Sequence, residues 1–249
     1  MNLDRVIAVR NTKTVYRDGD RCIKVFDESY PKSAILNEAL NMARMEEAGI
    51  NVPRLLEVGT VDGKWALFYE FIQGRTLAEL MEENPEKKDE YLELFVDIQL
   101  SVQAHSCTAL TQLKDKMQGK ISQTRLDATT RYELHTRLEG MPTHRKICHG
   151  DFNPSNVIIA DDGTPYVIDW AHVTQGNASA DAARTYLLFW LSGDLEGAER
   201  YLDLFCKKSD TAKQYVQKWM PIVAASQSVK ENEKEQGLLL SWVDVVDYG

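Results

Sequence analysis

In the first seventy positions of the chain, Asp-Gly pairs separate runs that are rich in Val, Ile, Tyr and Phe. Asp-Gly adopts a positive φ at little steric cost, so the pairs at 18–19 and 62–63 predict the turns of two β-hairpins. The four strands that these turns join are residues 13–17, 21–26, 55–61 and 64–72. Between the hairpins, the helical spacing of apolar residues over 31–48 predicts one helix that ends at Gly49. This order indicates a small, mostly antiparallel sheet that carries a single helix.

From Arg75 onward the apolar residues recur at helical spacing. One stretch departs from this pattern, residues 145–170, where two short β runs and a third Asp-Gly pair flank a polar loop. The predicted helices are residues 91–105, 122–138, 180–191, 195–207, 211–225 and 229–246. The pattern therefore predicts an α+β chain of two lobes, a small antiparallel β lobe over residues 1–73 and a larger, mostly helical lobe over 74–249.

The 249 residues include 29 basic and 38 acidic side chains, which give a formal net charge of −9. This balance argues against general binding to nucleic acid, because such binding requires a basic surface. No window approaches the ~18 apolar residues of a membrane helix, and the start lacks a secretion signal, so no membrane partner is expected. The four cysteines form no C-x-x-C pair, which indicates reduced thiols in a cytoplasmic protein.

The most informative segment is the run HGDFNPSN at residues 149–156, which is followed by a hairpin and then by IDW at 168–170. It places the oxygen-bearing side chains of Asp151, Asn156 and Asp169 at the ends of predicted strands. Such hard ligands suit Mg²⁺, which binds through one or two carboxylates together with substrate phosphates. Either aspartate taken alone could simply cap a turn. The combined spacing is far more specific, and it favours a metal and phosphate site.

On these motifs the sequence resembles the aminoglycoside phosphotransferase and choline kinase family over residues 15–188. The resemblance implies a two-lobed, protein-kinase-like fold and the transfer of phosphate from ATP, or alternatively GTP, to a hydroxyl of a small polar molecule. It implies that Asp151 accepts or orients the proton of the attacking hydroxyl, and that Asn156 and Asp169 hold Mg²⁺ on the nucleotide phosphates. The partners that follow are a nucleotide and a small-molecule acceptor.

The resemblance also assigns two supporting residues. His149 would hold the catalytic loop and the metal-binding strand together, which differs little from the role of an ordinary buried histidine. Asp181 would brace the backbone of that loop with its carboxylate. An aspartate favoured by the helix dipole in a first turn is the alternative explanation for Asp181.

An ion pair in the small lobe is a further expectation. Lys24 shares a strand face with Cys22 and Phe26 by period-2 alternation, and a lysine among apolar neighbours needs an anion. Glu38 lies 14 residues later, at the margin of the apolar face of the predicted helix. In kinase-like folds such a lysine contacts the α- and β-phosphates and such a glutamate holds it in place. A surface lysine with a packed aliphatic stem is the alternative.

The same resemblance locates the nucleotide. Glu70 C=O and Ile72 N–H match the backbone groups that pair with adenine, although a plain edge strand would have the same sequence. Residues 8–15 match the loop that covers the phosphates but contain no glycine. The hydroxyls of Thr12 or Thr14 could then donate to phosphate, and the affinity for ATP is expected to be modest.

Other classes of protein fit the sequence less well. A P-loop is excluded because Gly59 and Gly63 are separated by three residues rather than four, and a zinc site lacks ligand spacing. A protein kinase is disfavoured because only eleven residues separate Asp169 from Asp181, and there is no D-F-G and no A-P-E. A catalytically weak or inactive kinase-like nucleotide binder is favoured by the missing glycines and opposed by the retained site residues.

The sequence gives least information about the molecule that accepts the phosphate. Acidic residues near the C-terminus could line a cleft and bind an amine, which favours an aminoglycoside or an amino alcohol. A solvated acidic helix face explains them at least as well, because Lys230 and Lys234 intersperse the run. The residues concerned are Glu231, Glu233, Glu235, Asp244 and Asp247.

Overall fold

The computed structural model describes residues 5–10 and 12–243, which form two compact units. Unit 1 contains the residues up to Glu83 together with Pro154–His172, and unit 2 contains Asn84–Asn153 together with the residues from Val173 onward. This division differs from the one predicted at residue 73, because strand β6 (Gly74–Thr76) pairs with β8 (Val157–Ala160) and so joins the later hairpin to unit 1.

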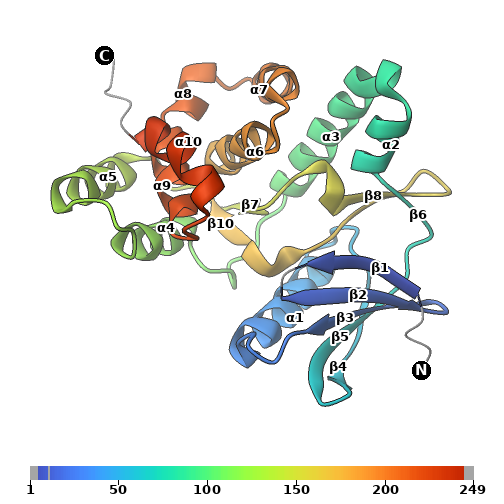
Figure 1. Cartoon of the computed structure of the whole chain (residues 1–249). Helices are drawn as coiled ribbons and strands as arrows, with labels where there is room; N and C mark the ends of the chain where they lie inside the picture. The colour runs from blue at the N-terminus through green and yellow to red at the C-terminus, as the bar shows by residue number, and fades with distance from the viewer. Residues whose placement is uncertain (1–4, 11, 244–249) are drawn as a thin grey trace. The chain divides into compact units, whose positions relative to one another are not determined.

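Unit 1 is built on a five-stranded antiparallel sheet in the order β1-β2-β3-β5-β4 (Figure 1). The two predicted Asp-Gly turns are present, with φ of +59° at Gly19 and +80° at Gly63. One strand, β1, was not predicted, and it pairs with β2 at the edge of the sheet. The strands are β1 (Arg5–Arg10), β2 (Lys13–Asp18), β3 (Arg21–Phe26), β4 (Leu55–Val61) and β5 (Lys64–Glu70).

Helix α1 (Lys32–Glu47) packs against β4 and β5 and ends before Gly49, which has a φ of +81°. Leu36 and Leu40 are exposed on this helix, whereas Glu38, expected at the margin of the apolar face, is buried. The ion pair that Glu38 makes with Lys24 of the sheet explains why this carboxylate turns inward. The buried residues of α1 are Ile35, Glu38, Ala39, Asn41, Met42 and Met45.

A second, three-stranded sheet completes unit 1 in the order β6-β8-β9, with β9 spanning Pro165–Val167. Gly74 is required where β6 meets β8, because a Cβ atom there would lie 2.3 Å from Ile159 O. Helix α2 (Leu77–Glu83) follows β6 directly and contacts β8. A 3₁₀ turn over Trp170–His172 packs against α1, so residues from the middle of the chain lie beside the N-terminal helix.

Unit 2 is mostly helical and contains one small sheet of β7 (Lys146–Cys148) and β10 (Thr174–Gly176). Its core includes an aromatic cluster in which the rings of Phe95 and Phe152 stack with centroids 4.5 Å apart. No helix in the described part of the chain is both long and apolar enough to cross a lipid bilayer. The helices of unit 2 are α3 (Lys88–Gln103), α4 (Leu113–Ser122), α5 (Ala128–Gly140), α6 (Ala178–Ser192), α7 (Leu195–Ser209), α8 (Lys213–Gln217), α9 (Met220–Ser228) and α10 (Glu233–Val243).

Two predicted helices differ from the observed ones. The segment 122–138 is helical only from Ala128 onward as α5, where the Asp127 side chain accepts a hydrogen bond from Thr130 N–H at 3.0 Å and caps the helix, and α4 before it was not predicted. The segment 211–225 breaks between α8 and α9, where Pro221 lies in the first turn of α9. Capping aspartates and first-turn prolines begin helices rather than continue them, and both signals are visible in the sequence.

Candidate active site

The catalytic-loop motif begins in unit 2, directly after β7. His149 is fully buried and packs edge-to-face against Phe152, with ring centroids 5.8 Å apart. Its Nδ1 atom accepts a hydrogen bond from Asp151 N–H at 3.2 Å. Gly150 between them has a φ of +79°, a conformation that glycine adopts without steric cost. The histidine therefore holds the loop backbone from within the core, and its implied contact with the metal-binding strand stays a prediction.

The loop is held a second time by α6. Asp181 Oδ1 accepts a hydrogen bond from Gly150 N–H at 2.8 Å, which is the backbone contact that the resemblance implies. Its other oxygen accepts from the side chains of Gln99 and Gln103 at 3.3 Å and 3.2 Å. Because Asp181 is buried and accepts these three bonds, it fixes the backbone just before Asp151.

Arg184 is a residue of this unit to which the sequence analysis assigns no role. It lies one helical turn after Asp181, with Nη2 at 3.4 Å from Asp151 Oδ1 and Nε at 3.4 Å from Gly150 O. The side chain of Asp151 is 27% exposed and that of Arg184 is 12% exposed. The spacing of three residues from Asp181 places both on one face of α6, and this was the signal available in the sequence.

The predicted ion pair is present in unit 1. Lys24 on β3 donates to Glu38 Oε1 on α1, and these residues are only 7% and 1% exposed. Burial by itself lowers the pKa of Lys24, but the carboxylates of Glu38 and Asp169 outweigh it and raise that pKa above its usual value. Lys24 therefore remains an ammonium in a buried site, as a group that binds phosphate must.

If Glu38 acts only by positioning Lys24, the activity losses of Lys24→Ala and Glu38→Ala should not add. We expect the double variant to lose about as much kcat/KM for ATP as the worse single variant, since both changes remove one functional unit. A double-mutant cycle on kcat/KM measures this. Losses that add fully would show that the pair does not act as a unit.

The two predicted metal ligands lie at adjacent ends of one hairpin in unit 1. The pairing of β8 with β9 places Asn156 beside Ile168, whose N–H donates to Asn156 O at 3.0 Å, and Asp169 follows directly. Asp169 has a φ of +65°, and such strained backbone is often found at functional sites. One amide oxygen and one carboxylate form a donor set that fits Mg²⁺ when phosphates and water supply the remaining ligands.

The described residues contain no group of three or more His, Cys, Asp or Glu that could hold a metal without such help. Asp169 instead lies against two ammonium groups, with Lys24 Nζ at 3.1 Å from Oδ1 and Lys13 Nζ at 3.0 Å from Oδ2. Burial raises the pKa of the Asp169 carboxyl, but the ammonium groups of Lys24 and Lys13 hold it well below its usual range. Asp169 is therefore an anion, as metal binding requires.

Lys13 is a second residue beside Lys24 that was not predicted from the sequence. Val15 pairs with Lys24 across β2 and β3, so Lys13 shares the Lys24 face, whereas Thr14 pairs with Val25 and lies on the opposite face. Thr14 therefore does not share the Lys24 face, and its phosphate role stays a prediction. Thr12 is exposed in the turn before β2, and its phosphate role stays a prediction. If the pairing of Val15 with Lys24 is assumed, the alternation of side chains along residues 13–17 predicts that Lys13 lies on the Lys24 face.

The predicted adenine-binding backbone lies at the end of β5. Glu70 pairs with Arg21 on β3, and its N–H donates to Arg54 O at 3.0 Å. The Glu70 carboxylate also pairs with the Arg54 side chain at 2.7 Å. Among the described residues, no backbone hydrogen bond donated by Ile72 N–H is found. The adenine contacts of Glu70 and Ile72 stay predictions.

Comparison with known proteins gives one family profile and a set of similar folds. A sequence profile described as the phosphotransferase enzyme family matches residues 6–215. A search of curated protein sequences finds no match. Among solved structures, a thermostable mutant of the aminoglycoside phosphotransferase APH(4)-Ia, in a ternary complex with AMP-PNP and hygromycin B, matches with a TM-score of 0.70 and 18% identity, over 96% of this chain and 90% of that one.

Two further structures match as well. Choline kinase LicA from Streptococcus pneumoniae has a TM-score of 0.63 and 14% identity, over 100% of this chain and 88% of its own. An aminoglycoside-3'-phosphotransferase of type VIII has a TM-score of 0.65 and 18% identity, over 89% and 93% of the two chains. At these identities the matches establish the fold. The predicted kinase-like α+β fold is confirmed.

Proposed function

The chain belongs to the phosphotransferase enzyme family, and from this premise we propose that it transfers the γ-phosphate of Mg·ATP to a hydroxyl of a small polar molecule. The observation that supports this most is the buried Lys24–Glu38 pair, with Asp169 3.1 Å from the same ammonium. A charged lysine and a carboxylate beside it are what phosphoryl transfer needs, because this reaction depends on positioning and on neutralising charge.

The proposed reaction forms a bond between the acceptor oxygen and the γ-phosphorus. It breaks the bond between the γ-phosphorus and the oxygen that bridges the β- and γ-phosphates, and this oxygen leaves with ADP. Asp151 orients the hydroxyl and takes its proton, while Lys24 neutralises the α- and β-phosphates. Asn156 and Asp169 would hold Mg²⁺, whose charge would stabilise the phosphate oxygens. Asp151 and Asn156 are five residues apart in one loop, so the chain alone keeps them within about 18 Å.

Lys13 is proposed as a second phosphate-binding cation in the part of the chain where the loop lacks glycine. We expect Lys13→Gln to raise the Kd of Mg·ATP by about 10- to 100-fold, the size of one lost charge-assisted hydrogen bond. Isothermal titration with Mg·ATP measures the change, and Lys64→Gln in the same sheet serves as the control for lost charge. A Kd that is equal in the two variants would remove Lys13 from the phosphate site.

Two other functions, a protein kinase and an inactive nucleotide binder, can be distinguished from the proposed one. A protein kinase is disfavoured because β10 and a single 3₁₀ turn occupy the short connection from Asp169 to α6, which leaves no activation segment. An inactive nucleotide binder would bind Mg·ATP without forming ADP in the presence of any acceptor. A coupled ADP-release assay over small alcohols and sugars therefore tests the proposed function. A cytoplasmic location, which the spacing of the cysteines in the sequence favours, is part of the same proposal.

The carboxylates that favoured an amine-bearing acceptor do not support it in the described residues. Glu231 pairs with Arg125 at 2.7 Å, and Glu235 accepts hydrogen bonds from Gln227 and Asn232. Asp244 and Asp247 lie outside the described residues. An aminoglycoside or amino alcohol therefore stays a prediction from the sequence alone.

A further inference from the structure

Helix α6 holds the backbone of the catalytic loop with three of its side chains. Asp181 Oδ1 accepts a hydrogen bond from Gly150 N–H at 2.8 Å, and Arg184 Nε lies 3.4 Å from Gly150 O. Thr185 Oγ1 donates to Phe152 O at 2.9 Å. Arg184 and Thr185 follow Asp181 by three and four positions, so all three lie on one side of the helix. The loop backbone is therefore fixed both before and after the catalytic aspartate.

The side chain of Asp151 keeps a freedom that this backbone anchoring does not remove. An aspartate on a fixed backbone can still change its χ1 and χ2 rotamers, and this side chain is partly exposed to solvent. Misplacing a catalytic group by about 1 Å can lower a rate about 100-fold, so the carboxylate must be held as well as the backbone. Arg184 Nη2 lies 3.4 Å from Asp151 Oδ1, and this ion pair restricts the rotation.

The position of Arg184 is costly for the protein. Its side chain is largely buried, and its Nη1 has no hydrogen-bond partner among the described residues. Burial lowers the pKa of Arg184, and the Asp151 carboxylate is the strongest attraction that opposes this effect. Packing alone would be served as well by an apolar side chain, because buried ion pairs replaced by apolar residues often leave stability unchanged. Partly unsatisfied buried polar groups are expected mainly at functional sites.

We propose that Arg184 is a positioning residue of the phosphotransfer reaction, whose guanidinium holds the Asp151 carboxylate in the orientation that receives the proton of the acceptor hydroxyl. This inference rests on the proposed function and adds a residue to the same site. The planar guanidinium bridges Gly150 O and Asp151 Oδ1, so it ties the carboxylate to the anchored backbone. Arg184 acts through Asp151 and contacts neither the nucleotide nor the acceptor.

A comparison of kcat with KM tests this role. The acceptor is whichever of glycerol, ethanolamine, glucose, glucosamine and glucose 6-phosphate gives the fastest ADP release from the wild type. We expect Arg184→Gln to lower kcat by about 10- to 100-fold, the size of the effect of a misplaced catalytic group. The Kd of Mg·ATP should stay near that of the wild type, because the proposed nucleotide-binding residues belong to unit 1. Arg184→Lys keeps a cation but loses the planar fork, so it should regain part of the lost kcat.

Two results of this comparison would overturn the proposal. An unchanged kcat in Arg184→Gln would show that Arg184 does not position the carboxylate. A loss confined to the KM of the acceptor would show that Arg184 contacts the acceptor directly. No ADP release from the wild type with any of the five acceptors would instead contradict the proposed function, so the two failures are distinguishable.

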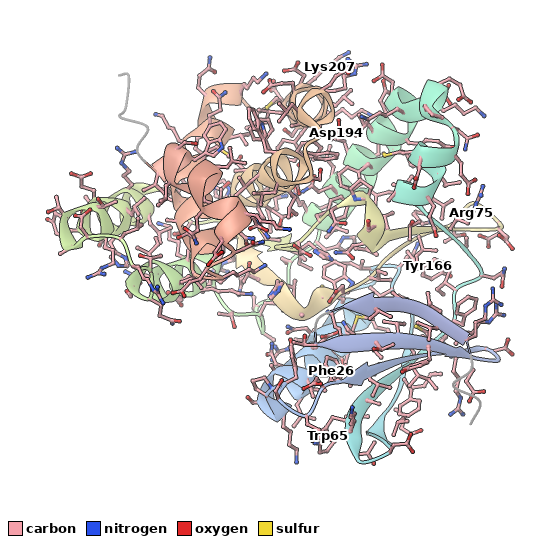
Figure 2. All side chains as sticks on the ribbon, viewed as in Figure 1. Phe26, Trp65, Arg75, Tyr166, Asp194 and Lys207 are labelled. Atoms are coloured by element: carbon pink, nitrogen blue, oxygen red, sulfur yellow. The ribbon has the colours of Figure 1, made fainter. Side chains whose placement is uncertain are left out.

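Arg200→Gln is the matched control, because it breaks another arginine–aspartate pair within unit 2. Arg200 lies on α7, between the labelled residues Asp194 and Lys207 (Figure 2). Its Nε lies 3.1 Å from Asp89 Oδ1. The kcat of Arg200→Gln should equal that of the wild type. A loss as large as that in Arg184→Gln would show that breaking any such pair lowers kcat, and would overturn the proposal.

A double-mutant cycle separates a positioning role from a structural one. In the Asp151→Asn background the carboxylate that Arg184 orients is absent, so Arg184→Gln should lower the remaining single-turnover rate by less than about threefold. A structural role would lower the rate by the same factor in both backgrounds, and this result would overturn the proposal. If Arg184→Gln fails to fold, the cycle is run with Arg184→Lys, which keeps the positive charge beside the loop, and the same two outcomes decide.

Discussion

Replacing Asp151 with asparagine should lower kcat by about 10²- to 10⁴-fold or more, the range over which orienting and general-base groups act. Asparagine has the size of aspartate and keeps an oxygen that can accept from Arg184, which lies 3.4 Å from the carboxylate. It cannot take the proton of the acceptor hydroxyl. We therefore expect the melting temperature and the affinity for Mg·ATP to stay near those of the wild type while turnover is nearly lost.

The measurement is kcat from coupled ADP release at saturating acceptor, together with Kd for Mg·ATP by titration calorimetry. Asp161→Asn is a suitable control, because it removes one carboxylate from an exposed turn between β8 and β9. Its turnover should equal that of the wild type. If Asp151→Asn turned over as fast as this control, Asp151 would not handle the proton.

Asp169→Asn should abolish the part of nucleotide binding that depends on Mg²⁺. The loss should be at least about 100-fold, because even an outer partner of a metal ligand is worth about 10- to 100-fold in metal affinity. Asparagine tolerates the left-handed φ of +65° found at this position, so backbone strain does not confuse the result. Lys13 and Lys24 also lose a shared anion, which should lower the free energy of unfolding by about 1–3 kcal/mol.

Titrating ATP with and without Mg²⁺ isolates this effect. In the wild type the metal should tighten binding, whereas in Asp169→Asn the two affinities should be nearly equal. Binding without metal should be kept, because Lys24 and Lys13 remain to contact the phosphates. A variant that still bound ATP more tightly with Mg²⁺, by the same factor as the wild type, would show that Asp169 is not a metal ligand.

The fold was predictable where local chemistry determines it. The Asp-Gly turns and the helix that ends before Gly49 follow from backbone preferences of a few residues, and all appear in the structure. Strand β1 was missed because its apolar residues Val6, Ile7 and Val9 are largely exposed at a sheet edge, where no alternation is required. Two helices were predicted too long because apolar spacing continued past a capping Asp127 and past Pro221.

The residues of the candidate site were predictable only where they belong to a sequence motif or place a charge among apolar residues. Lys24 is recognisable because an ammonium among apolar strand residues requires an anion, and Glu38 supplies it. Lys13 and Arg184 look like ordinary surface cations, since their partners Asp169 and Asp151 are brought to them only by tertiary structure.

The most direct test of the proposed function is ³¹P nuclear magnetic resonance of the wild-type protein with Mg·ATP and a mixture of neutral, cationic and anionic hydroxyl acceptors. The proposed function predicts that the ATP signals are replaced by those of ADP and, in equal amount, by one new phosphomonoester, and that Asp151→Asn forms neither. Bound ATP that remains intact with every acceptor, or ADP that appears together with inorganic phosphate alone, would contradict it.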